Sequence, residues 1–120
     1  MGDIKLGVVE SKFADIIWNN EPMTSRQLVE MAKDELDWNK STTYTILRRL
    51  CERGILQNEN GTVTSLISKD EFFAVQSEQF VDETFDGSLP AFIAAFTRRK
   101  KLSKKEIEEI QAMIDAAKED

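Results

Sequence analysis

The chain has 120 residues, which is enough for one small domain with an appended segment, and its formal net charge is −6. It has no histidine and one cysteine, so it lacks the commonest general base and metal ligand, and an intramolecular disulfide is excluded. It also lacks a glycine-rich phosphate loop, a bilayer-length apolar run and a signal peptide, so we expect a cytoplasmic protein without enzyme activity, cofactor or metal site.

The first two predicted elements are helices. Residues 6–18 place apolar side chains at helical spacing, and the pattern stops near residues 19–22. A capping box follows, because Thr24 and Gln27 stand three residues apart ahead of an apolar stripe. The stripe consists of Leu28, Val29, Ala32 and Leu36. The pattern predicts a second helix, joined to a third by a short turn.

The third predicted helix, residues 39–54, carries the functional hypothesis. Asn39 is a good N-cap, and Gly54 suits the end of the helix because glycine adopts the left-handed conformation without strain. One face is mainly apolar and comprises Thr43, Ile46, Leu47 and Leu50. The opposite face carries hydroxyls, a phenol and guanidiniums: Ser41, Thr42, Tyr44, Thr45, Arg48 and Arg49. Such a face suits the major groove of double-stranded DNA, where hydroxyls meet phosphates and base edges and arginine pairs with guanine.

A β-hairpin is predicted directly after this helix. Asn60-Gly61 between two β-prone runs is the strongest short-range signal for a hairpin turn. A hairpin that follows a helix-turn-helix is the wing of a winged helix, which gives a DNA-binding domain over residues 1–70. Thr62 follows the turn, and it is the wing residue that we expect to donate a hydrogen bond to DNA.

Residues 71–120 have the pattern of three amphipathic helices without a core of their own. Ser68, Ser88 and Ser103 are their candidate N-caps, and Asp86-Gly87 separates the first helix from the second. Unpaired apolar stripes predict a two-fold dimer through this region. The expected dimer residues are Phe72, Phe80, Phe92, Phe96, Ile107, Ile110 and Ile114. The expected fold class is therefore mainly α (α+β), with a winged helix-turn-helix followed by dimerisation helices.

Three stretches of the chain resemble a known family. Residues 6–18, residues 38–56 and residues 102–110 are similar to the first helix, the DNA-reading helix with its first wing strand, and the C-terminal helix of the penicillinase repressor family. The resemblance implies a homodimeric repressor that binds an inverted-repeat operator in double-stranded DNA. It also implies regulation of the β-lactam-resistance type, with release through a membrane sensor-protease pathway.

The same resemblance points to one bond. Induction in the family cuts an Asn-Phe bond in the helix before the last one, and Ala95-Phe96 stands at the matching position here. Phe96 is kept and the asparagine is not. The wing also departs from the family, because Thr62 replaces an arginine, which leaves open whether the wing contacts DNA. The chain ends without the paired cysteines of the copper-responsive members, so no metal is expected.

Two other functions remain open on the sequence alone. One is a winged helix that binds a protein, which the acidic balance favours; the other is a small-molecule-responsive repressor from a different winged-helix family. The basic run Arg98-Arg99-Lys100-Lys101 fits a solvated hinge, a contact to the DNA backbone or a contact to an acidic partner. Cys51 stands beside the apolar face of the third helix, and we expect it to pack there, partly buried.

Overall fold

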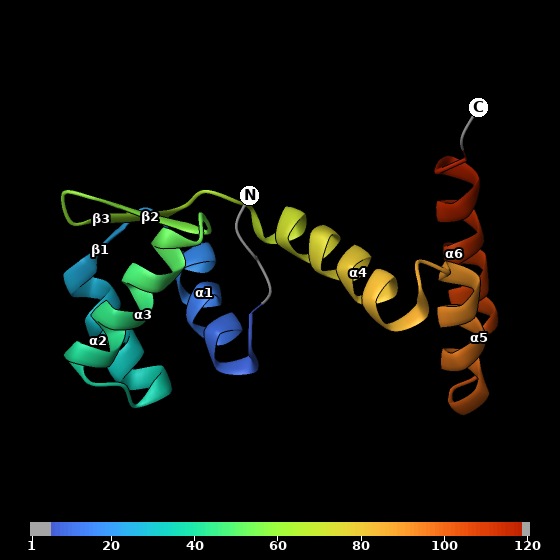
Figure 1. Ribbon diagram of the computed structural model, residues 1–120, viewed down its shortest axis with the longest axis horizontal. Coiled ribbons are helices and arrows are strands. Elements are labelled where there is room, and N and C mark those ends of the chain that lie inside the picture. Colours follow the sequence, from blue (N-terminus) through green and yellow to red (C-terminus); the bar gives the residue numbers. More distant parts are fainter. Residues whose placement is uncertain (1–5, 119–120) are drawn as a thin grey trace. The chain divides into compact units, whose positions relative to one another are not determined.

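A computed structural model describes residues 6–118, and within them the fold is mainly helical with one antiparallel three-stranded sheet (Figure 1). The elements are α1 Val8–Asn20, β1 Met23–Thr24, α2 Ser25–Leu36, α3 Lys40–Glu52, β2 Leu56–Glu59, β3 Thr62–Ser65, α4 Lys69–Phe85, α5 Leu89–Arg99 and α6 Lys104–Ala116. The predicted fold class is confirmed. The chain forms two compact units, and the division between them falls inside α4, after Glu78.

The helix ends in the first unit are where the local signals predict them. The Thr24 hydroxyl accepts from the Gln27 N–H at 3.0 Å, and the Gln27 side chain accepts from the Thr24 N–H at 2.9 Å, so the capping box is complete. The Asn39 side chain accepts from the Thr42 N–H at 2.8 Å at the start of α3. Gly54 follows α3 with a φ of 79°, a conformation that most other residues adopt only with strain.

The predicted hairpin is confirmed, and its turn lies at Asn60-Gly61, whose φ angles are 53° and 86°. Positive φ at both central residues is what the tight turns that match strand twist require. The sheet also contains β1, which was not predicted: Met23 pairs with Val63 and Thr24 with Thr62, giving the order β1-β3-β2. In Figure 1 the helices α1, α2 and α3 lie on one side of this sheet.

The core of the first unit lies between the sheet and these helices. Its buried apolar side chains are Leu6, Phe13, Ala14, Ile16, Ile17, Met23, Leu28, Ala32, Leu47, Leu50, Ile55, Leu56, Val63 and Phe72. Trp18 closes one end, because its indole N–H donates to the Ile67 carbonyl at 3.0 Å and its ring lies 5.4 Å from that of Phe72. Lys69 adds an ion pair with Asp15 on α1 at 2.8 Å, so the start of α4 is fixed to the first unit.

Phe72 therefore corrects one sequence-based expectation. It was expected in a dimer interface, but its exposed fraction is 0% and it packs in the core of the first unit. Its neighbour Phe73 is 47% exposed. The reason is the phase of α4, which the contact with Trp18 sets: one of two adjacent phenylalanines turns inward and the other outward.

The second unit is held together by aromatic side chains. The rings of Phe80, Phe85, Phe92 and Phe96 lie 5.6–6.2 Å apart, in the tilted and edge-to-face arrangements that aromatic pairs prefer. Asp86 and Gly87 end α4 with left-handed φ angles of 52° and 80°, where the predicted helix stop lies. No residue of α5 or α6 is buried in the described part of the chain. Apolar side chains of this unit that remain exposed are Phe80, Leu89, Ile93, Phe96, Ile107, Met113 and Ile114.

Candidate nucleic-acid interface

The residues predicted to face DNA lie together on the outer side of α3. Ser41, Tyr44, Thr45, Arg48 and Arg49 are exposed, and Thr42 is half-buried at the helix start. The opposite side of α3 contributes Thr43, Leu47 and Leu50 to the core. The buried Thr43 hydroxyl donates to the Asn39 carbonyl at 3.1 Å, so this polar group is satisfied within the helix. The helix thus presents one continuous polar face to solvent.

Ser25 links this face to the wing. Its hydroxyl accepts from the Tyr44 hydroxyl at 3.2 Å, and its backbone N–H donates to the Gly61 carbonyl at 2.8 Å. The start of α2, the exposed face of α3 and the wing turn therefore meet at one residue. Sequence reasoning missed Ser25, because both contacts are long-range and no local pattern marks them. Arg26, which follows it in the first turn of α2, is exposed.

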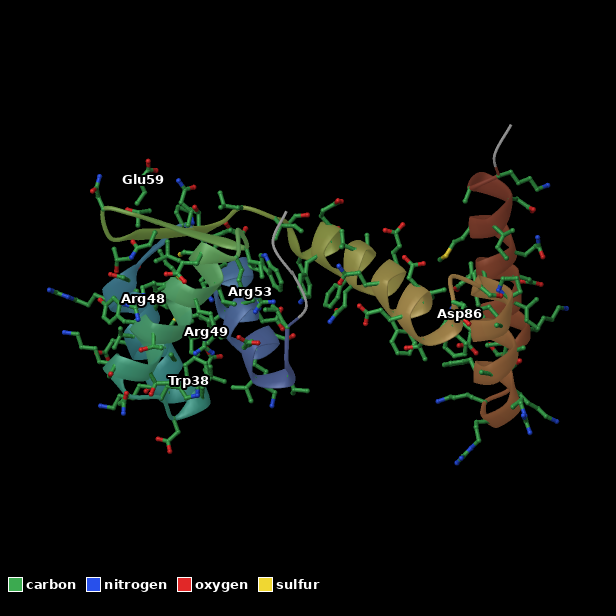
Figure 2. The ribbon with its side chains drawn as sticks, viewed as in Figure 1. Trp38, Arg48, Arg49, Arg53, Glu59 and Asp86 are labelled. Atoms are coloured by element: carbon green, nitrogen blue, oxygen red, sulfur yellow. The ribbon has the colours of Figure 1, made fainter. Side chains whose placement is uncertain are left out.

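Two arginines lie on α3, and a third, Arg53, is its C-cap residue (Figure 2). Arg48 and Arg49 are exposed, and neither forms an ion pair within the described residues. Arg53 lies 3.7 Å from the Glu10 carboxylate of α1, which neutralises part of its charge. Arg48 and Arg49 are thus the arginines on α3 that are best placed to bind a phosphate of DNA. Arg53 instead joins the end of α3 to α1.

The wing carries little positive charge. Residues 55–67 contain neither lysine nor arginine, and Glu59 is their one acidic residue. Glu59 pairs directly with Thr62 across the β2–β3 ladder, so the two exposed side chains lie on the same face of the hairpin. Figure 2 shows Glu59 on the wing, pointing away from the helices. Thr62 is accessible for a hydrogen bond, but a carboxylate lies beside it.

The predicted dimer residues other than Phe72 lie in the second unit. Ile107 and Ile114 are each 52% exposed on α6, and Phe80 and Phe96 are 50% and 46% exposed. Phe92 and Ile110 are half-buried, and together with Ile93, Phe96, Thr97 and Leu102 they line an apolar cavity of about 200 Å³. Ala95, which precedes Phe96 at the bond that matches the family's cleavage site, is exposed within α5.

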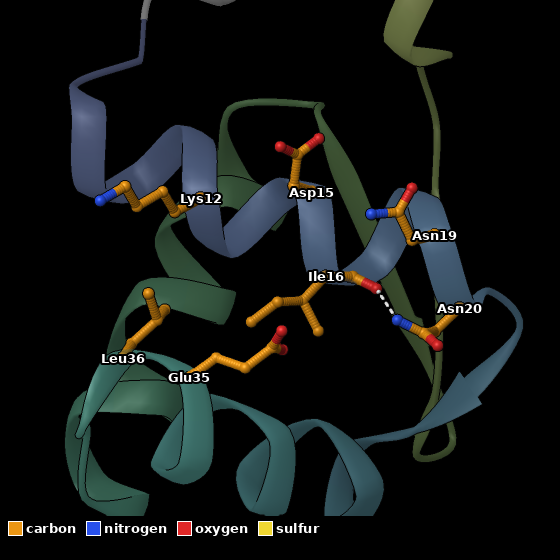
Figure 3. A pocket seen from close by; sticks show the side chains of 7 residues that line it. All are labelled: Lys12, Asp15, Ile16, Asn19, Asn20, Glu35 and Leu36. Carbon is orange, nitrogen blue, oxygen red and sulfur yellow. Dashed lines mark hydrogen bonds between the residues drawn. The ribbon is translucent and has the colours of Figure 1, made fainter.

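Three cavities lie in the described part of the first unit, and one of them, of about 380 Å³, lies beside Trp38 and Asn39 between α2 and α3. The other two lie elsewhere in this unit. One, of about 310 Å³, lies between α1 and α2 and is lined by Lys12, Asp15, Ile16, Asn19, Asn20, Glu35 and Leu36 (Figure 3). The hydrogen bond drawn among its residues, from the Asn20 amide to the Ile16 carbonyl at 2.7 Å, caps α1. The other, of about 420 Å³, is lined by Tyr44, Leu47, Arg48, Cys51 and Asn58. It adjoins the exposed face of α3.

Cys51 is partly buried beside that last cavity, as a packing residue would be. Burial raises the pKa of its thiol, and the nearby Glu52 charge adds to the rise, whereas a hydrogen bond with the Asn58 backbone lowers the pKa. The thiol therefore stays protonated at neutral pH. Within residues 6–118, no three His, Cys, Asp or Glu side chains are grouped to hold a metal ion, and no helix has the length and apolar character needed to cross a bilayer.

Comparison with known proteins gives consistent likenesses. A family model described as penicillinase repressor matches residues 6–116. The methicillin resistance regulatory protein MecI of Staphylococcus aureus strain Mu50 is 22% identical over 115 residues, covering 92% of this chain and 94% of MecI. The penicillinase repressor of Bacillus licheniformis is 24% identical over 113 residues, covering 91% of this chain and 88% of that protein.

One solved structure is also similar. The solution structure of the monomeric form of Bacillus licheniformis BlaI in complex with the blaP half-operator matches with a TM-score of 0.50 and 21% sequence identity. The match covers 59% of this chain and 93% of that one. At this level of identity the likeness shows the fold, which supports a winged helix.

Proposed function

The chain belongs to the penicillinase repressor family, and on that basis we propose that it is a homodimeric transcriptional repressor that binds an inverted-repeat operator. The observation that carries the proposal is the outer face of α3, where hydroxyls and two arginines are exposed together. In winged helices the second helix of the helix-turn-helix enters the major groove. The similar BlaI structure is a monomeric form in complex with a half-operator, which is consistent with one winged helix for each half-site.

The contacts divide by chemistry. Arg49, or Arg48 beside it, has the planar fork that pairs with the O6 and N7 atoms of guanine. The Thr42 and Thr45 side chains offer a hydroxyl to phosphates or base edges and a methyl group to thymine. Tyr44 is held by its hydrogen bond to Ser25, and we expect it to contact the DNA backbone. Ser41 stands in the first turn of α3, where the positive end of the helix dipole favours a phosphate.

Dimerisation through the second unit would bring two such faces onto one operator. That unit leaves Ile107, Met113 and Ile114 of α6 more than half exposed, which is costly for a free chain in water. A second copy would cover them with a matching apolar surface. Each α3 would then occupy one half-site, and repression would follow from competition with RNA polymerase for the promoter.

Release from the operator would follow from cutting the chain at Ala95-Phe96. A cut there would separate α6 and the end of α5 from the DNA-binding unit. The gain from linking two half-sites, commonly about 10²–10⁴ in avidity, would then disappear. The bond lies within a helix, so a protease would need α5 to open locally first. Mass spectrometry of the repressor from antibiotic-exposed cells would test this, and an intact chain during full derepression would rule it out.

The proposed function is tested by a mobility-shift assay with DNA from upstream of the gene. Replacing Arg49 by alanine should weaken binding by about 1–3 kcal/mol and relax specificity at one base pair if Arg49 reads guanine. If Arg49 contacts only a phosphate, the loss of affinity should be the same for all DNA sequences, and the slope of log K against log salt should become shallower by about 1. Lys12→Ala, on α1, is the control with the same charge change. A wild-type chain that bound no DNA at low salt would refute the proposal.

A second candidate function is a winged helix that binds a protein. The cation-free wing and the net charge of −6 favour it, since both weaken attraction to phosphates. The same assay separates the two candidates, because a protein-binding module would show no operator-specific complex at any salt concentration. Small-molecule control of DNA binding is the third candidate, and the apolar cavity of about 200 Å³ in the second unit is its candidate site.

A further inference from the structure

The turn between α5 and α6 concentrates positive charge to an unusual degree. We call residues 98–105 the basic turn; it contains Arg98, Arg99, Lys100, Lys101, Lys104 and Lys105. These are six of the sixteen lysines and arginines in the chain, and no acidic residue lies among them. All six are exposed. Within the described residues, none of them forms an ion pair, although the rest of the chain is strongly acidic.

The placement of two lysines is unfavourable for the helix that carries them. Lys104 and Lys105 lie in the first turn of α6, where the positive end of the helix dipole disfavours cations. Arg98 and Arg99, in contrast, lie in the last turn of α5, where cations are favoured. Clustering and dipole together make the basic turn costly for the folded chain. The Glu106 carboxylate offsets part of this cost, because its charge interacts with Lys100. Costs of this kind that are only partly offset are typical of functional sites.

The geometry of the turn fits a chain of phosphates better than a single small anion. The N-terminus of α6 is already occupied, because the Ser103 hydroxyl accepts from the Glu106 N–H at 3.0 Å and the Glu106 carboxylate accepts from the Ser103 N–H at 3.0 Å. The free amides that would cradle one phosphate are thus partly used. What remains is a spread of flexible cations, which suits a polyanion with regularly spaced charges.

We propose that the basic turn binds the phosphate backbone of the DNA that flanks the operator, without regard to sequence. This inference rests on the proposed function. DNA is the favoured occupant because the first unit would hold the operator. Since α4 joins the two units covalently, the effective concentration of DNA near the basic turn is then high. The wing has no cation with which to contact the DNA backbone, so another part of the chain must supply such a contact. A second copy of the acidic chain is the competing occupant, and the experiment distinguishes it.

The test compares two duplexes bound by the intact protein. One is the shortest upstream duplex that still forms a sequence-specific complex, and the other carries about three helical turns of unrelated sequence on each side of it. For the wild type, the slope of log K against log salt should be steeper on the flanked duplex, by about 0.9 for each flanking phosphate neutralised. Lys100→Gln with Lys101→Gln should remove about 2 from that extra slope and leave the shorter duplex unaffected. Lys12→Gln with Lys118→Gln is the control of equal charge change.

Four results would overturn the inference. Equal slopes for the wild type on both duplexes would refute it while leaving operator binding intact. Equal effects of the two double variants would show only a change in net charge. A Lys100→Gln/Lys101→Gln variant that sedimented as a monomer, at concentrations where the control is dimeric, would assign the basic turn to the contact with a second copy. A wild type that bound neither duplex would refute the proposed function as well.

Discussion

The carboxylate of Glu21 accepts both hydrogen bonds that Ser65 can donate. The Ser65 N–H lies 2.8 Å from Oε1, and its hydroxyl lies 2.9 Å from Oε1 and 2.7 Å from Oε2. Glu21 is the C-cap of α1, and Ser65 is the last residue of β3. The end of the first helix is therefore fixed to the end of the wing, across 44 positions of sequence.

Ser65→Ala should lower the free energy of unfolding by about 1–2 kcal/mol, because it removes a hydrogen bond to a charged acceptor in a half-buried site. Urea unfolding followed by circular dichroism measures this. Ser77→Ala is the control, since Ser77 is exposed on α4 and the change there should stay within about 0.5 kcal/mol. Equal losses in the two variants would show that the Glu21 contact adds nothing to stability.

Phe72→Ala and Phe73→Ala should differ sharply although the two residues are adjacent. Phe72 is fully buried, so its loss should cost about 3–5 kcal/mol through the cavity that it leaves. Phe73 is 47% exposed, and its loss should cost about 1 kcal/mol. Urea unfolding would measure both. Similar losses of stability in the two variants would contradict the burial of Phe72 in the core and would favour the expected dimer interface instead.

Glu59→Lys should tighten DNA binding if the wing approaches the backbone. The change replaces a repelled carboxylate with a cation beside Thr62, and the slope of log K against log salt should become more negative by about 0.9. Fluorescence anisotropy with an operator duplex at several salt concentrations would show it. Glu78→Lys, an exposed position on α4, carries the same charge change. If the two variants behave alike, the wing does not approach DNA.

Ile107→Asp combined with Ile114→Asp should separate the proposed dimer. Both side chains are 52% exposed, so the change leaves the packing of a single chain nearly intact while placing charges in an apolar interface. The dimer dissociation constant should rise at least about 100-fold. Ala112→Asp with Ala116→Asp, on the opposite side of α6, should leave sedimentation unchanged. A double variant at Ile107 and Ile114 that remained dimeric would move the interface off α6.

The raised pKa of Cys51 has a kinetic consequence. Because the thiolate is the reactive form, iodoacetamide should modify Cys51 more slowly in the folded chain than in urea at about pH 8. The sign of the stability effect is also fixed. A folded-state pKa above the ordinary 9.0 adds stability that is fully present below that pH and is lost as the pH rises through the folded-state value. Equal rates in the folded and unfolded chain would contradict the burial of Cys51.

The features that sequence predicted well are those fixed by neighbouring residues. Asn39 caps α3 and Asn60-Gly61 makes the hairpin turn because each outcome depends on a few adjacent backbone groups. The polar face of α3 followed in the same way, since helical spacing alone decides which side chains share a face.

The features that sequence missed depend on distant contacts. The two-residue strand β1 is too short for any alternation to show, and it exists because β3 offers it a partner. The choice between Phe72 and Phe73 rests on Trp18, which no pattern within α4 reveals. The same holds for Ser25, whose partners lie on α3 and in the wing turn.

The hydrogen bond from Ser25 to the Gly61 carbonyl constrains how this protein can be redesigned. A graft that places arginines on the wing would change its charge freely, because the β2 and β3 side chains near the tip are exposed. A graft that lengthened the turn by even one residue would displace the Gly61 carbonyl and leave the first amide of α2 without its acceptor. Wing chemistry in this scaffold is exchangeable, and wing length is not.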